Sequence, residues 1–167
     1  EQIKDDKTTQ VYSSSAIREA IKTGNMEKAN QMLGYAWFME GIVVHGDKRA
    51  RKMNFPTANI SPHDQIYPLK GVYAIKTLIN HKYINGIANF GERPTVDGKK
   101  LLLEVNLFDF NEEIYGNYLT VEFLTFIRGE KKFDSFALLA DQIKKDVQNV
   151  KKYHQDKKIN FKFYGLK

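Results

Sequence analysis

The stretch from His45 to Pro62, HGDKRARKMNFPTANISP, places several basic residues ahead of a hydroxyl and an amide side chain. Thr57 and Asn59 follow Pro56 closely, and each carries an oxygen that can face a cation. One interpretation is a site for a phosphate with its metal ion, because basic side chains neutralise phosphate charge and hard cations prefer oxygen ligands. The other interpretation is a solvated loop, and the segment alone does not separate the two.

The glycines of this region do not form a Walker phosphate loop. In GIVVHGDK the spacing of Gly41 and Gly46 is right, but Asp47 occupies the position of the required Lys and no hydroxyl residue follows it. An acidic side chain there would repel the phosphates, which excludes that class of nucleotide site. The two glycines can still let backbone N–H groups approach an anion closely.

A carboxylate interrupts the apolar pattern of LLLEVNLFDF, residues 101–110. One face of this predicted strand is wholly apolar and consists of Leu101, Leu103, Val105 and Leu107. Strand geometry points Glu104 to the opposite face, beside Asn106 and large hydrophobic side chains. Partial desolvation would raise the proton affinity of such a carboxylate and suit it to general-base chemistry. A Glu on the wet face of a half-exposed sheet has the same spacing, so periodicity leaves both interpretations open.

Length, charge and composition narrow the possible classes of protein. A chain of 167 residues with 42% hydrophobic residues can form one domain with a sizeable core. The net charge of +6 permits an anionic partner, but charges of both signs are interspersed and do not select one. The absence of Cys excludes disulfides and thiolate metal sites. No signal-peptide pattern and no apolar run of about 18 residues is present, which predicts a cytoplasmic protein without a membrane partner.

The predicted helices lie at the two ends of the chain. SSSAIREAI offers Ser15 as an N-cap, Gly24 ends that helix, and a second helix, MEKANQML, stops at Gly34. A longer helix follows residue 133, with Asp134 or Ser135 as its cap. One face of it is apolar and consists of Phe136, Leu139, Ala140, Ile143, Val147 and Val150.

The middle of the chain reads as strands separated by turn residues. Five β-branched and aromatic runs carry the pattern: WFMEGIVVHG, GVYAIKTLI, YINGIANF, LLLEVNLFDF and YLTVEFLTFI. Five or six strands with short connections indicate an antiparallel sheet rolled into a barrel.

These motifs together resemble the riboflavin kinase module of bacterial bifunctional FAD synthetases. The resemblance covers roughly residues 35–150 and rests on GIVVHGDKRARKMNFPTANI, GVYA, IANFGERPT, LEVNLFDF, YGNYLTVEFLTFIRGEKKF and LLADQIKKD. It implies a mainly β fold, a six-stranded antiparallel Greek-key barrel of the riboflavin-kinase type with a long C-terminal helix and two short N-terminal helices. It also implies ATP-dependent phosphorylation of the riboflavin 5′-hydroxyl to give FMN and ADP.

The resemblance assigns roles to individual residues. Glu104 becomes the catalytic base, and Thr57 and Asn59 become ligands of Mg²⁺ at the ATP phosphates, starting from a backbone that Pro56 stiffens. One or two protein oxygens suffice for magnesium, which keeps several of its waters. The nucleotide-binding set is Gly41, His45, Gly46, Arg51, Pro56, Thr57 and Asn59, and the flavin-binding set is Asn59, Glu104, Arg128 and Phe133. Alternatives stay open for four of them: Arg128 as an exposed turn residue, Phe133 as a wall residue, His45 as a structural one, and Arg51 as a solvated loop residue.

The first residues suggest a second module. SSSAIR resembles the closing signature of the adenylyltransferase module that precedes the kinase in the bifunctional enzymes. We therefore expect residues 1–34 to be the remnant of that module with a linker, 35–155 the kinase, and 156–167 a Lys-rich tail. The chain is expected to be a monomer that packs on the adenylyltransferase module in a longer parent, and to make FMN but not FAD. Ala50, Asn54 and Asn106 depart from the family pattern.

Two other functions fit the composition. A basic β-barrel that binds single-stranded nucleic acid would interleave aromatic with basic residues on one strand face, whereas the aromatics here alternate with aliphatic or acidic residues. We therefore expect no nucleic-acid partner. A flavin-binding module without turnover is the second alternative, and riboflavin titration with and without Mg-ATP separates all three.

Overall fold

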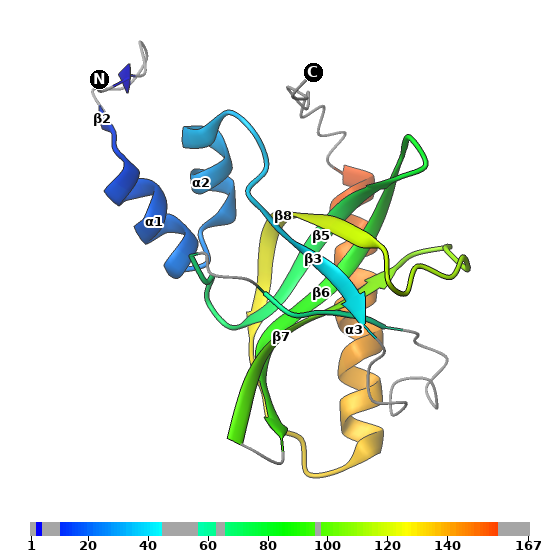
Figure 1. The fold of residues 1–167 in the computed structure, drawn as a ribbon. Helices are drawn as coiled ribbons and strands as arrows, with labels where there is room; N and C mark the ends of the chain where they lie inside the picture. Colours follow the sequence, from blue (N-terminus) through cyan, green and yellow to red (C-terminus); the bar gives the residue numbers. More distant parts are fainter. Residues whose placement is uncertain (1–2, 5–10, 45–56, 63–65, 96–97, 157–167) are drawn as a thin grey trace.

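A computed structural model describes residues 3–4, 11–44, 57–62, 66–95 and 98–156, and within it six antiparallel strands close into a barrel (Figure 1). The strands in spatial order are β3 (Phe38–Val44), β4 (Ala58–Ile60), β7 (Gly98–Leu107), β6 (Lys82–Thr95), β5 (Gly71–Ile79) and β8 (Tyr118–Gly129). Strands β5, β6 and β7 are successive neighbours and β8 returns beside β5, which is a Greek key. The predicted fold class is confirmed.

Alternation along β7 separates the core from the outer face of the barrel. Leu103, Val105 and Leu107 are buried inside, as their spacing predicts, together with residues such as Phe90 and Phe123 from neighbouring strands. The residues between them therefore point outward. Any chemistry carried by the even positions of β7 must take place on the outside of the barrel.

Two short helices precede the barrel, α1 (Ser14–Lys22) and α2 (Met26–Leu33). The N-cap of α1 is Ser13, whose Oγ accepts from the Ala16 N–H at 3.1 Å, so the prediction of Ser15 was wrong. All three consecutive serines have cap-forming side chains, and only backbone conformation selects among them. Helix α2 ends at Gly34, with φ at 78°, as predicted. A further short ladder pairs β1 (Ile3–Lys4) with β2 (Val11–Tyr12).

The helical pair shares the hydrophobic core of the barrel. Ile21 and Met26 are buried in the same cluster as Met39 and Phe123. Asn30 of α2 is fully buried and uses both ends of its amide: Nδ2 donates to the Phe123 carbonyl at 2.8 Å, and Oδ1 accepts from the Trp37 N–H at 2.7 Å. In space, α1 and α2 pack with the barrel; a module boundary at residue 34 stays a prediction.

Replacing Asn30 with Ala should destabilise the protein by about 2–4 kcal/mol, because it leaves a buried carbonyl and an N–H without their partner. Urea unfolding followed by tryptophan fluorescence measures the change. Gln31→Ala, at the exposed neighbouring position, is the matched control and should stay within about 0.5 kcal/mol. Equal stability of the two variants would contradict the claim that the hydrogen bonds of Asn30 stabilise the protein.

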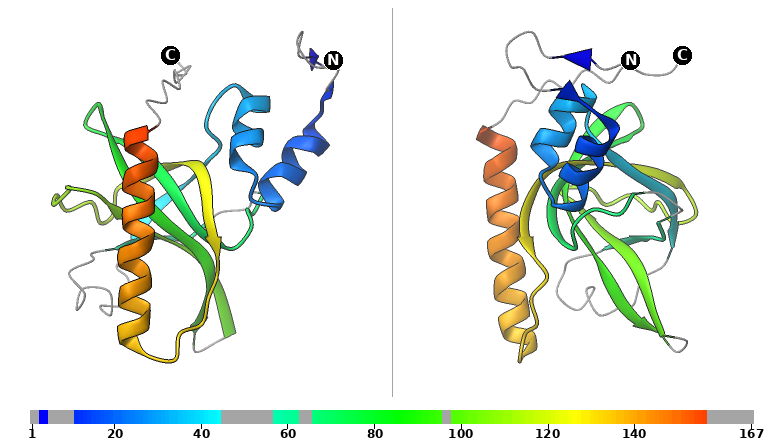
Figure 2. Two further views of the ribbon diagram at one scale, coloured as in Figure 1. Left: turned by 180° about the vertical axis from the view of Figure 1, so that it is seen from behind. Right: turned by 90° about the vertical axis from the view of Figure 1, so that its left-hand side faces the viewer.

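Helix α3 (Phe136–Asp156) runs along the outside of the barrel (Figure 2). Its second half packs on β5, β6 and β8, where Val150 and Val147 contact a cluster that includes Ala74 and Leu124. Ser135, one of the two predicted caps, accepts from the Leu138 N–H at 3.2 Å. Phe136, predicted to lie on the packed face, is 55% exposed because it belongs to the half of the helix that does not sit in this cluster.

Within the described residues, no helix combines the length and apolar character needed to cross a membrane.

Candidate functional site

The first half of α3 overhangs a cavity of about 580 Å³ on the outer face of the barrel. Strands β5, β6, β7 and β8 and the segment after β8 supply the opposite wall. Four residues predicted for the site line this cavity: Thr57, Glu104, Arg128 and Phe133. Apolar side chains line it as well, namely Val72, Ile87, Phe136, Leu139 and Ile143. A volume of this size and an apolar wall with few polar groups are typical of small-molecule sites.

Strand register aligns the polar residues of the site in one row across the barrel. Asn59 of β4 pairs with Glu104 of β7, and Glu104 pairs with Asn89 of β6. The row continues through Val72 of β5 to Arg128 of β8. Directly paired residues project from the same face of a sheet. Five strands therefore contribute to one outward-facing row, although its members lie far apart in sequence.

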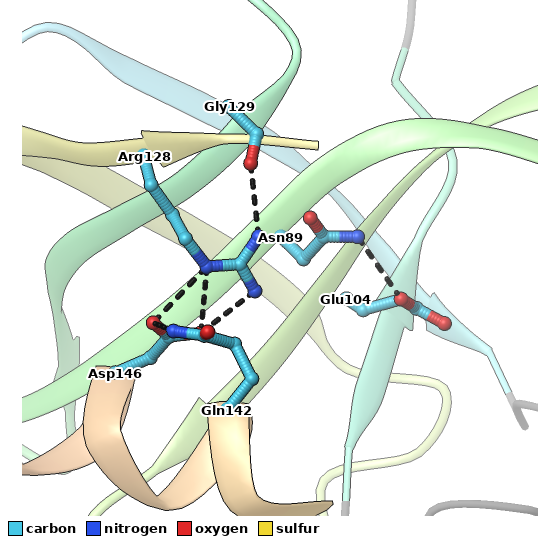
Figure 3. A network of polar contacts seen from close by, with 6 residues as sticks. All are labelled: Asn89, Glu104, Arg128, Gly129, Gln142 and Asp146. Carbon is cyan, nitrogen blue, oxygen red and sulfur yellow. Dashed lines mark hydrogen bonds and ion pairs between the residues drawn. The ribbon is translucent and has the colours of Figure 1, made fainter. Parts of the chain in front are cut away.

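Glu104 is half-buried in polar surroundings. Its Oε2 accepts from the Arg93 guanidinium. Figure 3 shows its second contact, in which Oε2 accepts from Nδ2 of Asn89 at 3.4 Å. Strand spacing along β7 did not predict these two contacts, because both Arg93 and Asn89 belong to the neighbouring strand β6. The hydrogen bond that Arg93 donates to Glu104 raises the pKa of Arg93 above its usual range. Both contacts use Oε2, and within the described residues Oε1 stays available to a ligand.

Asn59 carries an unusual polar atom. The residue is 6% exposed, and its Oδ1 is buried without a hydrogen-bond partner among the described residues. An unpaired buried acceptor costs about 1–3 kcal/mol, which a bound cation or its water would offset. Thr57, two residues earlier, places its side chain at the wall of the cavity. The described residues hold no group of three or more His, Asp or Glu arranged for a metal.

Most of the predicted nucleotide segment lies outside the part of the chain that the structure describes. His45, Gly46, Arg51 and Pro56 lie outside the described residues. Gly41 is buried in β3 opposite Leu119 of β8 and is not part of the cavity wall. The structure thus brings together the predicted base, both predicted metal ligands and the two flavin-side residues, but it does not bring Gly41 to them.

Arg128 is not the exposed turn residue that one interpretation allowed. It lies in β8 with its side chain 24% exposed, and it pairs with Asp146 of α3 (Figure 3). Its Nε lies 3.0 and 2.9 Å from the two carboxylate oxygens of Asp146, and Nη2 lies 2.7 Å from Oδ2. Its Cζ is 6.0 Å from the centre of the Phe133 ring. The pair joins the two walls of the cavity.

Sequence reasoning missed several polar residues of the site, among them Asn89, Arg93, Gln142 and Asp146. The first two belong to IANFGERPT, a segment noted above without a role for its polar residues. Asp146 had a readable signal, because it is an acidic residue between Ile143 and Val147 in the apolar stripe of a helix. Such a charge is buried only when it has a partner.

Comparison with protein families finds one match, over residues 33–154, to the family described as Flavokinase: Riboflavin kinase. A protein of Haemophilus influenzae named bifunctional riboflavin kinase/FMN adenylyltransferase is 48% identical over 86% of this chain and 47% of its own length. A Bacillus subtilis protein of the same name is 46% identical over 84% of this chain and 46% of its own length. The chain spans about half the length of these relatives.

Solved structures are similar as well. A Streptococcus pneumoniae protein described as a macrolide-efflux protein superposes with a TM-score of 0.80 and 38% identity, over 90% of this chain and 49% of that one. A riboflavin kinase from Trypanosoma brucei gives a TM-score of 0.51 and 25% identity, over 71% of this chain and 79% of that one. The match to the Trypanosoma brucei structure covers most of that riboflavin kinase.

Proposed function

Since the chain belongs to the riboflavin kinase family, we propose that its outer-face cavity binds riboflavin and that the site transfers the γ-phosphate of ATP to the 5′-hydroxyl, forming FMN and ADP. The observation that carries this proposal is the row from Asn59 to Arg128. It sets a carboxylate beside an unpaired buried oxygen at one end of a cavity, and an arginine at the other end, with apolar side chains between them.

The two ends of the cavity suit the two ends of riboflavin. The apolar wall formed by Val72, Ile87 and Ile143 accepts a flat aromatic ring, and Arg128 can donate to a ring carbonyl. The polyol chain then extends toward Glu104. Its Oε1 accepts the proton of the terminal hydroxyl as the oxygen bonds to phosphorus, while the bond between the γ-phosphorus and the bridging oxygen breaks and ADP leaves.

Magnesium suits the oxygens of Thr57 and Asn59. Two neutral side-chain oxygens are enough for an ion that keeps its waters and also binds phosphate oxygens. When bound, Mg²⁺ supplies charge neutralisation on the triphosphate. Thr57 and Asn59 orient that end of the site, and most of the catalysis in phosphoryl transfer comes from such positioning. We propose that ATP occupies the side of the row next to β4, where Thr57 and Asn59 lie.

The relatives' second activity belongs to those longer proteins. We propose that this chain acts as a cytoplasmic kinase module and that, in a longer parent, it packs on an adenylyltransferase module. The polar row and cavity account for the phosphorylation step alone. A flavin-binding role without turnover remains the competing function, and a carboxylate with one oxygen available at the end of the cavity favours turnover.

Incubation of the purified chain with riboflavin, ATP and Mg²⁺ should yield FMN and ADP in equal amounts, measured by chromatography. Riboflavin fluorescence should also change on binding, because the ring leaves water for an apolar cavity. A fluorescence change without product would favour the binding-only function, and the absence of both signals would refute the proposed site. FAD as a product of the pure chain would mean that an adenylyltransferase site lies outside the cavity described above.

A further inference from the structure

Asp146 reaches the cavity from α3 and holds the guanidinium of Arg128 from one side. The contact is bidentate and well formed, with Nε and Nη2 both within 3.0 Å of carboxylate oxygens. Two further hydrogen bonds complete it: Nη1 donates to the Gly129 carbonyl at 2.9 Å, and Gln142 Nε2 donates to Asp146 Oδ1 at 2.9 Å (Figure 3). Both the acid and the base of this pair are therefore fixed in orientation.

These contacts leave part of Arg128 available. A guanidinium has five N–H donors. The contacts to Asp146 and Gly129 engage Nε, Nη2 and Nη1, so one N–H on each terminal nitrogen stays available within the described residues. Arg128 also lines the cavity and lies 6.0 Å from the Phe133 ring centre. The side chain thus presents a flat face and two donors whose directions are set by Asp146.

The carboxylate of Asp146 is buried and does not form a surface ion pair. Asp146 is 2% exposed, and it lies in the wall of the cavity, as Arg128 does. A buried carboxylate is tolerated when its charge is balanced and its oxygens are hydrogen-bonded, as they are here. The pair is neutral as a whole. Arg128 therefore offers oriented donors to an uncharged ring, while Asp146 balances the positive charge that would otherwise attract anions.

We propose that Asp146 is a positioning residue for flavin binding, which orients and neutralises Arg128 so that its remaining donors and flat face meet the isoalloxazine ring. This inference rests on the proposed function, since it takes riboflavin as the ligand of the cavity. Asp146 itself acts through Arg128. If the pair only fastened α3 to β8, its loss would lower the stability of the protein. It would not weaken riboflavin binding relative to ATP binding.

The decisive variant is Asp146→Asn, which keeps the shape of the side chain and removes its charge. Its riboflavin affinity, titrated by flavin fluorescence without nucleotide, should fall by about 10- to 100-fold, the scale of lost charged hydrogen bonds. The KM for ATP should stay within about twofold of the parent. Asp141→Asn is the matched control, because Asp141 is an exposed acid of the same helix that pairs with Lys144, and it should bind riboflavin like the parent.

A double-mutant cycle tests whether the effect passes through Arg128. In an Arg128→Met background, adding Asp146→Asn should change riboflavin affinity by less than about twofold, because the residue to be positioned is gone. Additive losses would overturn the inference, and so would parent-like riboflavin affinity in the folded Asp146→Asn protein. If that protein does not fold, Gln142→Met replaces it: losing one hydrogen bond to Asp146 should weaken riboflavin binding by about threefold to tenfold, and no change would overturn the inference. A parent that fails to bind riboflavin would refute the proposed function instead.

Discussion

Glu104→Gln is expected to lower kcat for riboflavin phosphorylation by about 10²- to 10⁴-fold, the usual contribution of a positioned general base. Gln has nearly the same shape, can still accept from Arg93 and Asn89, and cannot take up a proton at neutral pH. Riboflavin binding and the unfolding midpoint should therefore change little. Steady-state kinetics with FMN detected by chromatography measures kcat. A fluorescence titration measures riboflavin binding, and a thermal unfolding curve measures the unfolding midpoint.

The matched control is Glu92→Gln. Glu92 is also an ion-paired carboxylate, with Lys70 and Lys99 as its partners, and these cations hold its pKa below the usual range. Unlike Glu104, it is not part of the cavity wall. Its loss should leave kcat within about twofold. A Glu104→Gln enzyme that turns over within about threefold of the parent would show that Glu104 serves Arg93 as a structural partner and that another group accepts the proton.

Thr57→Val is expected to raise the Mg²⁺ concentration for half-maximal activity by about 10- to 100-fold, as changes at metal sites commonly do. Val has the same shape as Thr without the hydroxyl, so the half-buried side chain can still pack. Riboflavin affinity without nucleotide should stay close to that of the parent, because the flavin end of the cavity is formed by other residues. Initial rates over a magnesium series at saturating ATP measure the effect.

Thr57→Ser restores an oxygen at the same position and is the control for the hydroxyl. It should recover most of the magnesium affinity, whereas loss of a packing contact alone would make Ser and Val similarly impaired. An unchanged magnesium dependence in Thr57→Val would remove Thr57 from the proposed metal site and leave the unpaired Asn59 oxygen as its remaining proposed ligand.

Local patterns predicted more of this protein than long-range ones did. The alternation along residues 101–107 correctly placed the core and the outward side of β7, and the periodicity after residue 135 correctly predicted α3. The family predicted from FPTAN and the neighbouring motifs is confirmed. Strand β4 was missed as a separate element, since Ala58–Ile60 is too short to show a period.

The surroundings of Glu104 and Arg128 were beyond such reasoning. Asn89 and Arg93 meet Glu104 only because β6 and β7 pair in one particular register, which a one-residue slip would reverse. Asp146 lies 18 residues after Arg128 in the sequence. The two side chains meet only because α3 packs against the barrel in one particular position. Side-chain partners set by packing between elements are not encoded in the spacing within either element.

The outward placement of the polar row has a consequence for how such a protein can diverge. Along β7, Leu103 and Val105 pack in the core of the barrel, while Glu104 between them faces the cavity. Selection for thermal tolerance and selection for catalysis therefore act on different, interleaved positions. The interior can drift among similar hydrophobic residues as a lineage adapts to a new temperature, while the exterior row stays under separate constraint. This separation gives the barrel room to evolve in robustness without a compensating loss of turnover.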